Sequence, residues 1–300
     1  MRRVVLRARE PTGRSHKLSL MAKQLEGATA REAAVYRQLL TSRGLSACLP
    51  RVFRVDELSH ERAIVFLEYV QRVSTWPWRD ISASATVMQH LASLHRMHTG
   101  TGAVLPAWDY ETMLRESAIT TLEQLRRMRR DPEFAWLRRS LPSLDRLVNA
   151  LPARRSELLA FDSFGKTLIH GDLHPGNVIV RKRDARPAPV FIDWARARTG
   201  SALEDVSSWL QTLAYWEPEV RRRHDTLLSC YLSAMGHENG LRSHVREAYW
   251  IAAGCNALAG ALRYHCWKAG TASSSRQRAG AAHAARDWLR IVERASAVSG

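Results

Sequence analysis

Near residue 70 the hydrophobic pattern of the chain changes its period, and this change restricts the folds that the chain can adopt. Before that point, short apolar runs predict a hairpin, Val4 to Ala8 with Lys17 to Lys23, and two further strands, Arg51 to Val55 and Ala63 to Tyr69. A helix from Thr29 or Ala30 to Leu40 is expected between the two pairs, because apolar residues recur there at helical spacing. The predicted order of this region is β-β-α-β-β.

After Val70 the apolar residues recur mainly at the spacing of a helix. We expect a helix at Ser84 to His98 and more helices through residues 110 to 160. The latter should break at Asp131-Pro132 and at Leu141-Pro142, because proline cannot continue the helical hydrogen bonds. Four further helices are predicted at 204 to 214, 225 to 235, 243 to 268 and 281 to 296.

One short hairpin is expected within the helical region, formed by Val178 to Val180 and Val190 to Ile192 around a polar loop, Arg181 to Pro189. The chain of 300 residues is long enough for two lobes around a cleft. We therefore predict an α+β protein with a small β-rich N-terminal lobe, residues 1 to 70, and a large, mainly helical C-terminal lobe, residues 71 to 300.

The formal net charge of +16 raises the question of a polyanionic partner. The arginines, however, are spread in ones to threes along every segment, whereas a nucleic-acid reader more often gathers them on one face with aromatic residues between them. We expect no nucleic-acid partner, and interpret the charge as an arginine-rich, solvated surface.

The cysteines and the apolar runs bear on location. The four cysteines are far apart and form no metal-ligand or disulfide pattern; they are Cys48, Cys230, Cys255 and Cys266. Only three apolar residues follow Met1-Arg2-Arg3, too few for a signal peptide, and no apolar run approaches the length of a membrane span. We expect a cytoplasmic protein with no membrane partner; its oligomeric state stays open.

The strongest chemical signal is His170-Gly171-Asp172-Leu173-His174-Pro175-Gly176-Asn177, followed after the hairpin by Ile192-Asp193-Trp194. Phosphoryl transfer to an alcohol needs a carboxylate that takes the hydroxyl proton, which Asp172 can supply. It also needs oxygen ligands for Mg²⁺, which Asn177 and Asp193 can supply. The predicted hairpin would bring Asn177 and Asp193 together, because they flank its two strands. The alternative is a polar surface loop in which Asp172 is a cap and Asn177 a turn residue.

The pattern H-G-D-L-H-P-G-N followed by I-D-W resembles the signature of the aminoglycoside phosphotransferase and choline kinase-like family, which is related to protein kinases. The resemblance implies a bilobal protein kinase-like fold and ATP as phosphoryl donor. It implies Asp172 as the catalytic base and Asn177 and Asp193 as magnesium ligands. The segment from Gly200 to Asp205 also resembles the G-x-x-x-x-D segment of the family, in which the aspartate is structural.

In the first lobe the same resemblance assigns nucleotide-binding residues. Lys23 would contact the α- and β-phosphates, and Glu32 would be its ion-pair partner. Glu68 and Val70 would offer a backbone C=O and N–H to adenine, as a kinase hinge does. His174 stands where many protein kinases have a lysine near the γ-phosphate. For each of these residues an ordinary structural role is the alternative.

The family carries a Gly-rich phosphate loop, whereas Gly13 is the sole glycine before Lys23. Two explanations stay open: a first strand is missing from this sequence, or Arg9 to Ser15 form a reduced cover over the phosphates. Only twelve positions separate Asp193 from Asp205, fewer than the long activation segment of protein kinases. The resemblance therefore implies a small-molecule hydroxyl acceptor: a sugar, an amino alcohol or an antibiotic. The alternative function is a nucleotide-binding, catalytically inactive scaffold.

Overall fold

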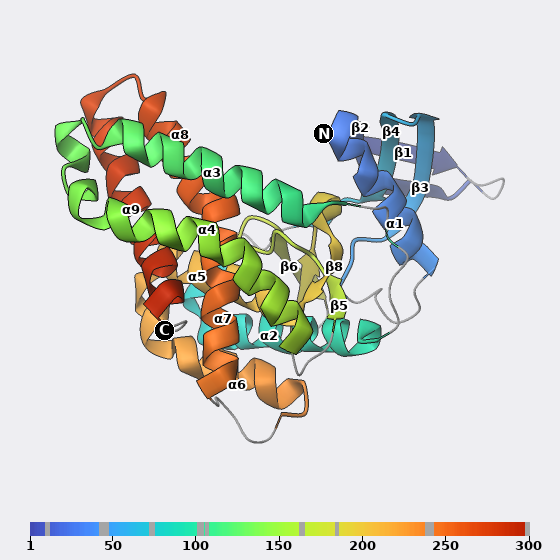
Figure 1. Cartoon of the computed structure of the whole chain (residues 1–300). Helices are drawn as coiled ribbons and strands as arrows, with labels where there is room; N and C mark the ends of the chain where they lie inside the picture. Colours follow the sequence, from blue (N-terminus) through green and yellow to red (C-terminus); the bar gives the residue numbers. More distant parts are fainter. Residues whose placement is uncertain are drawn as a thin grey trace. The chain divides into compact units, whose positions relative to one another are not determined.

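The computed structural model of the chain describes residues 1–9, 13–41, 48–71, 76–100, 105, 108–161, 166–183, 186–237 and 243–297 (Figure 1). The chain folds into two compact units, each built from three segments. Unit 1 comprises Met1–Ala107, Thr167–Gly200 and Trp209–Gly240, and unit 2 comprises Trp108–Lys166, Ser201–Ser208 and Leu241–Gly300. Unit 1 holds nearly all the strand residues, and unit 2 is mainly helical.

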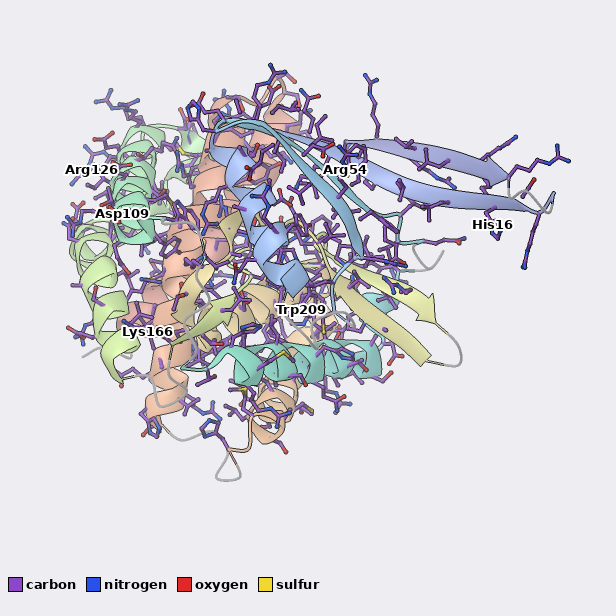
Figure 2. The ribbon with its side chains drawn as sticks, turned by 90° about the vertical axis from the view of Figure 1, so that its right-hand side faces the viewer. His16, Arg54, Asp109, Arg126, Lys166 and Trp209 are labelled. Carbon is purple, nitrogen blue, oxygen red and sulfur yellow. The ribbon has the colours of Figure 1, made fainter. Side chains whose placement is uncertain are left out.

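The main sheet of unit 1 confirms the four strands expected before residue 70. Its antiparallel strands have the order β1-β2-β4-β3, and their bounds are β1 Arg2–Arg9, β2 Ser15–Glu26, β3 Val52–Ser59 and β4 Arg62–Glu68. Alternate residues Ala63, Val65 and Leu67 of β4 are buried, as expected for a strand with one face on the core. Figure 2 labels His16 on the β1–β2 hairpin and Arg54 on β3. Residues 10–12, which belong to the possible phosphate cover at Arg9 to Ser15, lie outside the described residues.

The helix predicted between the strand pairs is α1, Arg31–Thr41, which follows a short 3-10 turn, Gly27–Ala30. It packs against β3 and β4 and against a second 3-10 turn, Trp194–Arg196. Ala33, Val35 and Tyr36 are almost completely buried. One side of α1 therefore faces the core under the sheet. Its first residues reach the segment that follows Asp193, one of the two predicted magnesium ligands.

Two more helices lie wholly within unit 1. The predicted helix at 84 to 98 is α2, Ile81–His98, which starts earlier because the Asp80 carboxylate accepts the backbone N–H of Ser82 at 2.8 Å and caps it. It packs against α6, His224–Ala234. Between the two helices, Nδ1 of His95 lies 2.8 Å from the Tyr231 hydroxyl.

Two small sheets of two strands each lie beside these helices. The predicted hairpin is β6, Val178–Arg183, paired with β7, Arg186–Phe191, so the expected loop at 181 to 189 is wrong. The two prolines of β7 fit, because both strands of a two-stranded sheet are edges and lack a neighbour on one side. The second sheet pairs β5, Lys166–Ile169, with β8, Arg198–Ser201, which the sequence did not predict.

Unit 2 consists of long helices that pack side by side. Their bounds are α3 Tyr110–Met128, α4 Leu137–Phe161, α7 Ser243–Asn256, α8 Leu262–Gly270 and α9 Ser275–Ala297; α5, Ala202–Trp216, begins in unit 2 and continues into unit 1. The predicted single helix at 243 to 268 is α7 and α8 joined by a π-helical turn, Ala257–Ala261. Among the described residues, no helix is both long and apolar enough to cross a membrane.

The predicted helix break at Leu141-Pro142 is wrong, whereas the break at Asp131-Pro132 is confirmed by a 3-10 turn at Pro132–Phe134. Helix α4 continues through Pro142, which is exposed and lies in its second turn. The lost hydrogen bond is offset because Leu137, Leu141 and Leu144 are buried on the other side of the helix.

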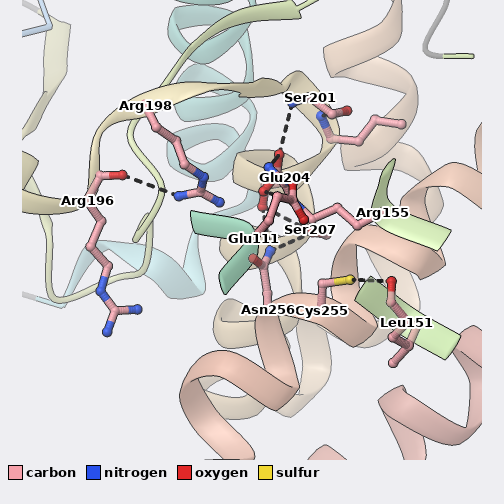
Figure 3. Close-up of polar contacts among 11 residues, drawn as sticks. Glu111, Leu151, Arg155, Arg196, Arg198, Ser201, Glu204, Ser207, Cys255 and Asn256 are labelled. Carbon is pink, nitrogen blue, oxygen red and sulfur yellow. Dashed lines mark hydrogen bonds and ion pairs between the residues drawn. The ribbon is translucent and has the colours of Figure 1, made fainter. Parts of the chain in front are cut away.

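A buried ion-pair network joins three elements of unit 2 (Figure 3). The Arg155 guanidinium donates from Nε and Nη2 to the two carboxylate oxygens of Glu204, at 3.2 and 3.0 Å, and also pairs with Glu111. Glu204 in turn accepts the backbone N–H of Ser201 at 2.9 Å, and its own carbonyl accepts from the Asn256 amide at 2.7 Å. Arg155 and Glu204 are 2% and 1% exposed, so neither charge can be satisfied by water.

Candidate active site

The residues of the H-G-D-L-H-P-G-N segment form a tight loop in unit 1 between the end of β5 and the start of β6. The loop turns at Gly171, whose φ of 78° lies in the left-handed region. A Cβ at this position would overlap the carbonyl oxygen of Arg196 and the side chain of Arg198. Glycine is therefore required here by both the backbone conformation and the close approach of another segment.

His170 connects this loop to the strand that precedes Asp193. Its Nδ1 accepts the backbone N–H of Asp172 at 3.3 Å, so its Nε2 carries the proton and donates to the Ile192 carbonyl at 2.8 Å. The ring is fully buried and packs against Trp194 at a centroid distance of 4.7 Å. This histidine belongs to the motif, but no role was predicted for it from the sequence.

Asn177 is fixed by three hydrogen bonds at the start of β6. Its side-chain nitrogen donates to the Asp172 carbonyl at 2.9 Å, and its backbone N–H donates to the His174 carbonyl at 2.8 Å. Its backbone carbonyl accepts from Ile192 at 2.9 Å, which places it beside the residue before Asp193. Because the nitrogen of the amide faces Asp172, the side-chain oxygen is the atom that can serve as a metal ligand.

Asp193 lies two residues after the end of β7 and has φ 66° and ψ 65°. It is the only non-glycine residue with positive φ in the part of the chain that the structure describes. Such a conformation costs on the order of 1–3 kcal/mol and must be held by its surroundings. The carboxylate is 47% exposed and accepts a hydrogen bond from Lys23 Nζ at 2.9 Å.

Lys23 on β2 joins the strand sheet to this site. Its Nζ lies 2.6 Å from Oε2 of Glu32 on α1, and the two side chains are 14% and 0% exposed. Burial alone would lower the pKa of Lys23, but the charge of Glu32 and the hydrogen bonds to Asp193 and Glu32 outweigh it and raise this pKa. Burial, opposed by Lys23, raises the pKa of Glu32. The structure thus brings together the lysine and the glutamate that the sequence paired.

The first residues of α1 hold the Asp193 segment in place. Arg31 Nη1 donates to the Ala195 carbonyl at 3.1 Å. The fully buried Tyr36 hydroxyl lies beside the Glu32 carboxylate and the Asp193 backbone N–H, although no described atom meets it in standard hydrogen-bond geometry. Burial, reinforced by the charge of Glu32, raises the pKa of Tyr36 well above its usual value. Tyr36 was not predicted from the sequence, although its position four residues after Glu32, on the same helix face, was an available signal.

Asp172 presents a carboxylate that is 41% exposed, with Nη1 of Arg196 at 3.9 Å from its Oδ1. Its backbone is held at both ends, by His170 and by Asn177. Arg196 and Arg198 were not identified from the sequence, and Nη1 of Arg198 donates to the Arg196 carbonyl at 3.3 Å (Figure 3). A carboxylate that keeps access to solvent can meet a ligand hydroxyl and accept its proton.

His174 lies in the same loop, and its Nδ1 accepts the backbone N–H of Gly176 at 3.0 Å. Burial lowers the pKa of His174, although the charge of Asp172 opposes this effect. The ring is therefore neutral at pH 7 with its proton on Nε2, so it can contact a phosphate as a hydrogen-bond donor rather than as a cation.

The expected hinge residues stand at the end of β4. The Glu68 carboxylate accepts from Arg181 Nη2 at 2.7 Å, and the Glu68 backbone N–H donates to the Arg51 carbonyl at 2.7 Å. Its neighbour Tyr69 donates its N–H to the Ser19 carbonyl at 3.3 Å, and Val70 is buried. The side chain of Glu68 is thus engaged by Arg181, and its part in adenine binding, like that of Val70, stays a prediction.

The donor atoms of the site suit Mg²⁺. An amide oxygen from Asn177 and a carboxylate from Asp193 are hard ligands of the kind that this ion prefers, and it usually binds few protein groups together with substrate phosphates. Among the described residues, no cluster of three or more His, Cys, Asp and Glu side chains could form a closed metal site. The residues present therefore fit an ion that is shared with a phosphate ligand.

Comparison with known proteins gives a family and a fold. The sequence matches the family described as "Phosphotransferase enzyme family" over residues 8–244. No curated protein sequence matches the chain.

Three solved structures illustrate the structural likeness. A choline/ethanolamine kinase family protein from Mesorhizobium loti has 13% identity and a TM-score of 0.58, with 98% of this chain and 90% of that chain covered. An aminoglycoside phosphotransferase from Alicyclobacillus acidocaldarius has 12% identity and a TM-score of 0.59, with 100% and 91% covered. An amicoumacin kinase in complex with AMP-PNP and Ca²⁺ has 14% identity and a TM-score of 0.57, with 97% and 85% covered. At these identities the likeness shows the fold, and the predicted α+β, kinase-like class is confirmed.

Proposed function

Because the chain belongs to the phosphotransferase enzyme family, we propose that it transfers the γ-phosphoryl group of ATP, with Mg²⁺, to a hydroxyl group of a small molecule. In this proposal residues 1–70 bind the nucleotide, and residues 71–300 carry the catalytic loop, the metal ligands and the acceptor pocket. The cytoplasm is its proposed location.

One observation supports the proposal: hydrogen bonds connect four residues from distant parts of the sequence into one network in unit 1. Lys23 contacts Asp193, and the Ile192 backbone next to Asp193 bonds to Asn177, whose amide bonds to the Asp172 backbone. The ammonium, the two metal-ligand candidates and the base candidate are the groups that phosphoryl transfer requires. The alternative of an unrelated surface loop gives no reason for these links.

Asp172 would act as the base. The acceptor hydroxyl donates a hydrogen bond to its carboxylate, and the hydroxyl oxygen forms a bond to the γ-phosphorus. The bond from that phosphorus to the bridging oxygen breaks, ADP departs with the electron pair, and the hydroxyl proton passes to Asp172. Asn177 and Asp193 would hold Mg²⁺, which when bound supplies positive charge against the phosphate oxygens.

Lys23 would contact the α- and β-phosphates. An ammonium has three N–H donors, and the bonds to Glu32 and Asp193 use two of them. One donor is therefore left for a phosphate oxygen while Glu32 keeps the side chain in place. The backbone groups of Glu68 and Val70 would receive adenine, and His174 would donate from Nε2 toward the γ-phosphate.

The acceptor is proposed as one of three classes that share a free hydroxyl: a sugar, an amino alcohol or an antibiotic. A panel of these compounds with Mg²⁺-ATP, assayed for ADP formation, tests the function. Asp172→Asn removes the base and keeps the shape. Glu219→Gln is the matched control, since Glu219 is 81% exposed and forms an ion pair with Arg222 at the surface.

Turnover with one acceptor that Asp172→Asn abolishes and Glu219→Gln preserves supports the enzyme. The second candidate is an inactive nucleotide-binding scaffold, which the single glycine before Lys23 favours. Nucleotide binding with no turnover on any acceptor would favour that scaffold. Turnover that persists in Asp172→Asn would contradict the assignment of the base.

A further inference from the structure

A hollow of about 450 Å³ lies in unit 2, and its lining includes no residue of the candidate active site. Its lining comes from two segments, residues 135–140 at the start of α4 and residues 286–293 of α9, which pack together (Figure 1). The lining residues are Ala135, Trp136, Arg139, Ser140, Arg286, Leu289, Arg290 and Glu293. The volume lies within the range of roughly 300–1,000 Å³ that small organic ligands fill.

The hollow carries an excess of positive charge. Arg139, Arg286 and Arg290 line it, against one acid, Glu293. Arg290 is paired with Asp287, at 3.2 Å. In the part of the chain that the structure describes, no carboxylate forms an ion pair with Arg139 or Arg286. The arginine side chains are exposed, so water and salt weaken their mutual repulsion, but an anion between Arg139 and Arg286 would still gain from both charges.

An aromatic side chain forms one wall. Trp136 donates its indole N–H to the Glu133 carbonyl at 3.1 Å, so its only polar group is already satisfied and the ring offers an apolar face. The ring is held by Phe134, which is fully buried, at a centroid distance of 6.2 Å. Leu289 lines the hollow on the α9 side, but at 1% exposed it offers almost no accessible surface, so the apolar wall is formed by Trp136. The guanidinium of Arg286 lies 5.9 Å from the Trp136 ring centroid, at the outer limit of a cation–π contact.

Exposed arginines are common in this arginine-rich chain, and single ones need no ligand to explain them. This place differs because two guanidiniums without carboxylate partners, a fixed indole and a hollow coincide. We propose that the hollow binds an organic anion that joins an aromatic ring to a phosphate or carboxylate group. The ring packs against Trp136, and the anionic group lies between Arg139 and Arg286.

The test is calorimetric titration of the full chain with phenyl phosphate, without nucleotide. The binding variants are Arg139→Gln, Arg286→Gln and Trp136→Leu. Arg138→Gln is the matched control, because Arg138 is an exposed neighbour that does not line the hollow. One site is expected in the wild type. Arg139→Gln and Arg286→Gln should each weaken it about tenfold or more, the loss that one charge-assisted hydrogen bond implies. Trp136→Leu should weaken it by up to about tenfold through the lost ring contact, and the control should leave it unchanged.

Two further probes separate the parts of the ligand. Inorganic phosphate should bind at least about tenfold more weakly than phenyl phosphate, because it lacks the ring, and benzoate shows whether a carboxylate replaces the phosphate. Circular dichroism of each variant checks that it folds.

Three outcomes overturn the proposal. Phenyl phosphate fails to bind; it binds all three folded variants as it binds the wild type; or Arg138→Gln weakens it as much as Arg139→Gln does, which would reflect overall charge. None of these results depends on phosphoryl transfer, since the assay follows binding alone.

Discussion

The Nζ atom of Lys23 lies 2.9 Å from Oδ1 of Asp193, although 170 positions separate the two residues in the chain. The same nitrogen lies 2.6 Å from Oε2 of Glu32. A lysine that is shared in this way neutralises the carboxylate that is proposed to hold Mg²⁺. In the proposed mechanism, Lys23 and a metal ion would therefore compete for Asp193 until phosphates bind both cations.

Lys23→Met should consequently change two affinities in opposite directions. The affinity for Mn²⁺ alone should rise about ten- to hundredfold, because Asp193 loses a charged hydrogen-bond partner, and the affinity for ATP should fall by a similar factor. Mn²⁺ titration followed by electron paramagnetic resonance and nucleotide titration measure the two effects. Lys166→Met, a change at an exposed lysine, is the control. Equal Mn²⁺ affinity in Lys23→Met and wild type would contradict the competition.

Tyr36→Phe should raise the Mg²⁺ concentration needed for half-maximal activity and lower kcat about tenfold, with little change in KM for ATP. The reason is that the buried hydroxyl lies beside the backbone N–H of Asp193 and the Glu32 carboxylate, so its loss loosens the metal ligand. Tyr231→Phe is the matched control, since that hydroxyl is also buried but bonds to His95. If both variants alter the Mg²⁺ requirement equally, the role of Tyr36 is only structural.

Two glycine variants separate backbone strain from steric overlap. Gly171 and Gly236 have similar φ values, 78° and 88°, but a Cβ meets nothing within 4 Å at Gly236 and overlaps Arg196 at Gly171. Gly236→Ala should cost about 1–2 kcal/mol, the cost of a left-handed conformation, with normal activity. Gly171→Ala should cost more and should lower activity at least about tenfold, because the Asp172 loop must shift. Chemical denaturation and turnover assays measure both; equal costs would exclude a steric effect.

Removal of Arg155 alone from its buried ion pair with Glu204 should destabilise the protein more than removal of both residues. Arg155→Leu leaves the Glu204 carboxylate buried without its bidentate partner, which costs about 3–5 kcal/mol in the free energy of unfolding. The double variant Arg155→Leu, Glu204→Leu should recover part of that loss. Denaturant titration of the single and double variants gives the comparison, and a double variant no more stable than Arg155→Leu would argue against it.

His265 on α8 provides a pH-dependent test. Burial, with a smaller effect from Lys268, lowers the pKa of His265 to about 4. The unfolded chain, with a pKa near 6.5, therefore binds more protons between these values, so the stability contribution is full above about pH 6.5 and decreases as the pH falls toward 4. Nuclear magnetic resonance titration should find the low value in the folded protein, and His265→Gln should lack this part of the stability loss. A ring that titrates near pH 6.5 would contradict the prediction.

The sequence predicted the main sheet, α1 and the hairpin that carries Asn177 and Asp193, because each has a short, regular apolar pattern bounded by turn residues. The prediction from sequence failed where the burial of side chains in the tertiary structure outweighs a local rule such as the helix-breaking effect of proline. Pro142 does not end α4, since buried leucines stabilise the helix on either side of it, and the prolines of β7 are accommodated at a sheet edge. The strands β5 and β8 are four residues each, too short for a periodic signal.

At the candidate active site, the motif identified the residues of the proposed chemistry, but it did not identify the residues that hold them in position. His170 works through two backbone groups, Asp172 N–H and Ile192 C=O, and no sequence pattern reports which carbonyl a histidine reaches. Tyr36 is recognisable only once α1 is docked against the segment from Asp193 to Ala195. Arg196 is likewise placed near Asp172 by the 3-10 turn that follows Asp193.

Strand β1 is an edge strand of the main sheet and pairs with β2. Its side chains include the exposed apolar residues Val5 and Leu6, a combination that invites strand-to-strand aggregation. The same strand carries four arginines, at positions 2, 3, 7 and 9. These arginines repel the same arginines on a second molecule and so oppose pairing of the two edge strands. Dissolved salt weakens that repulsion beyond a Debye length of about 8 Å at physiological strength. Aggregation through β1 should therefore increase with salt concentration.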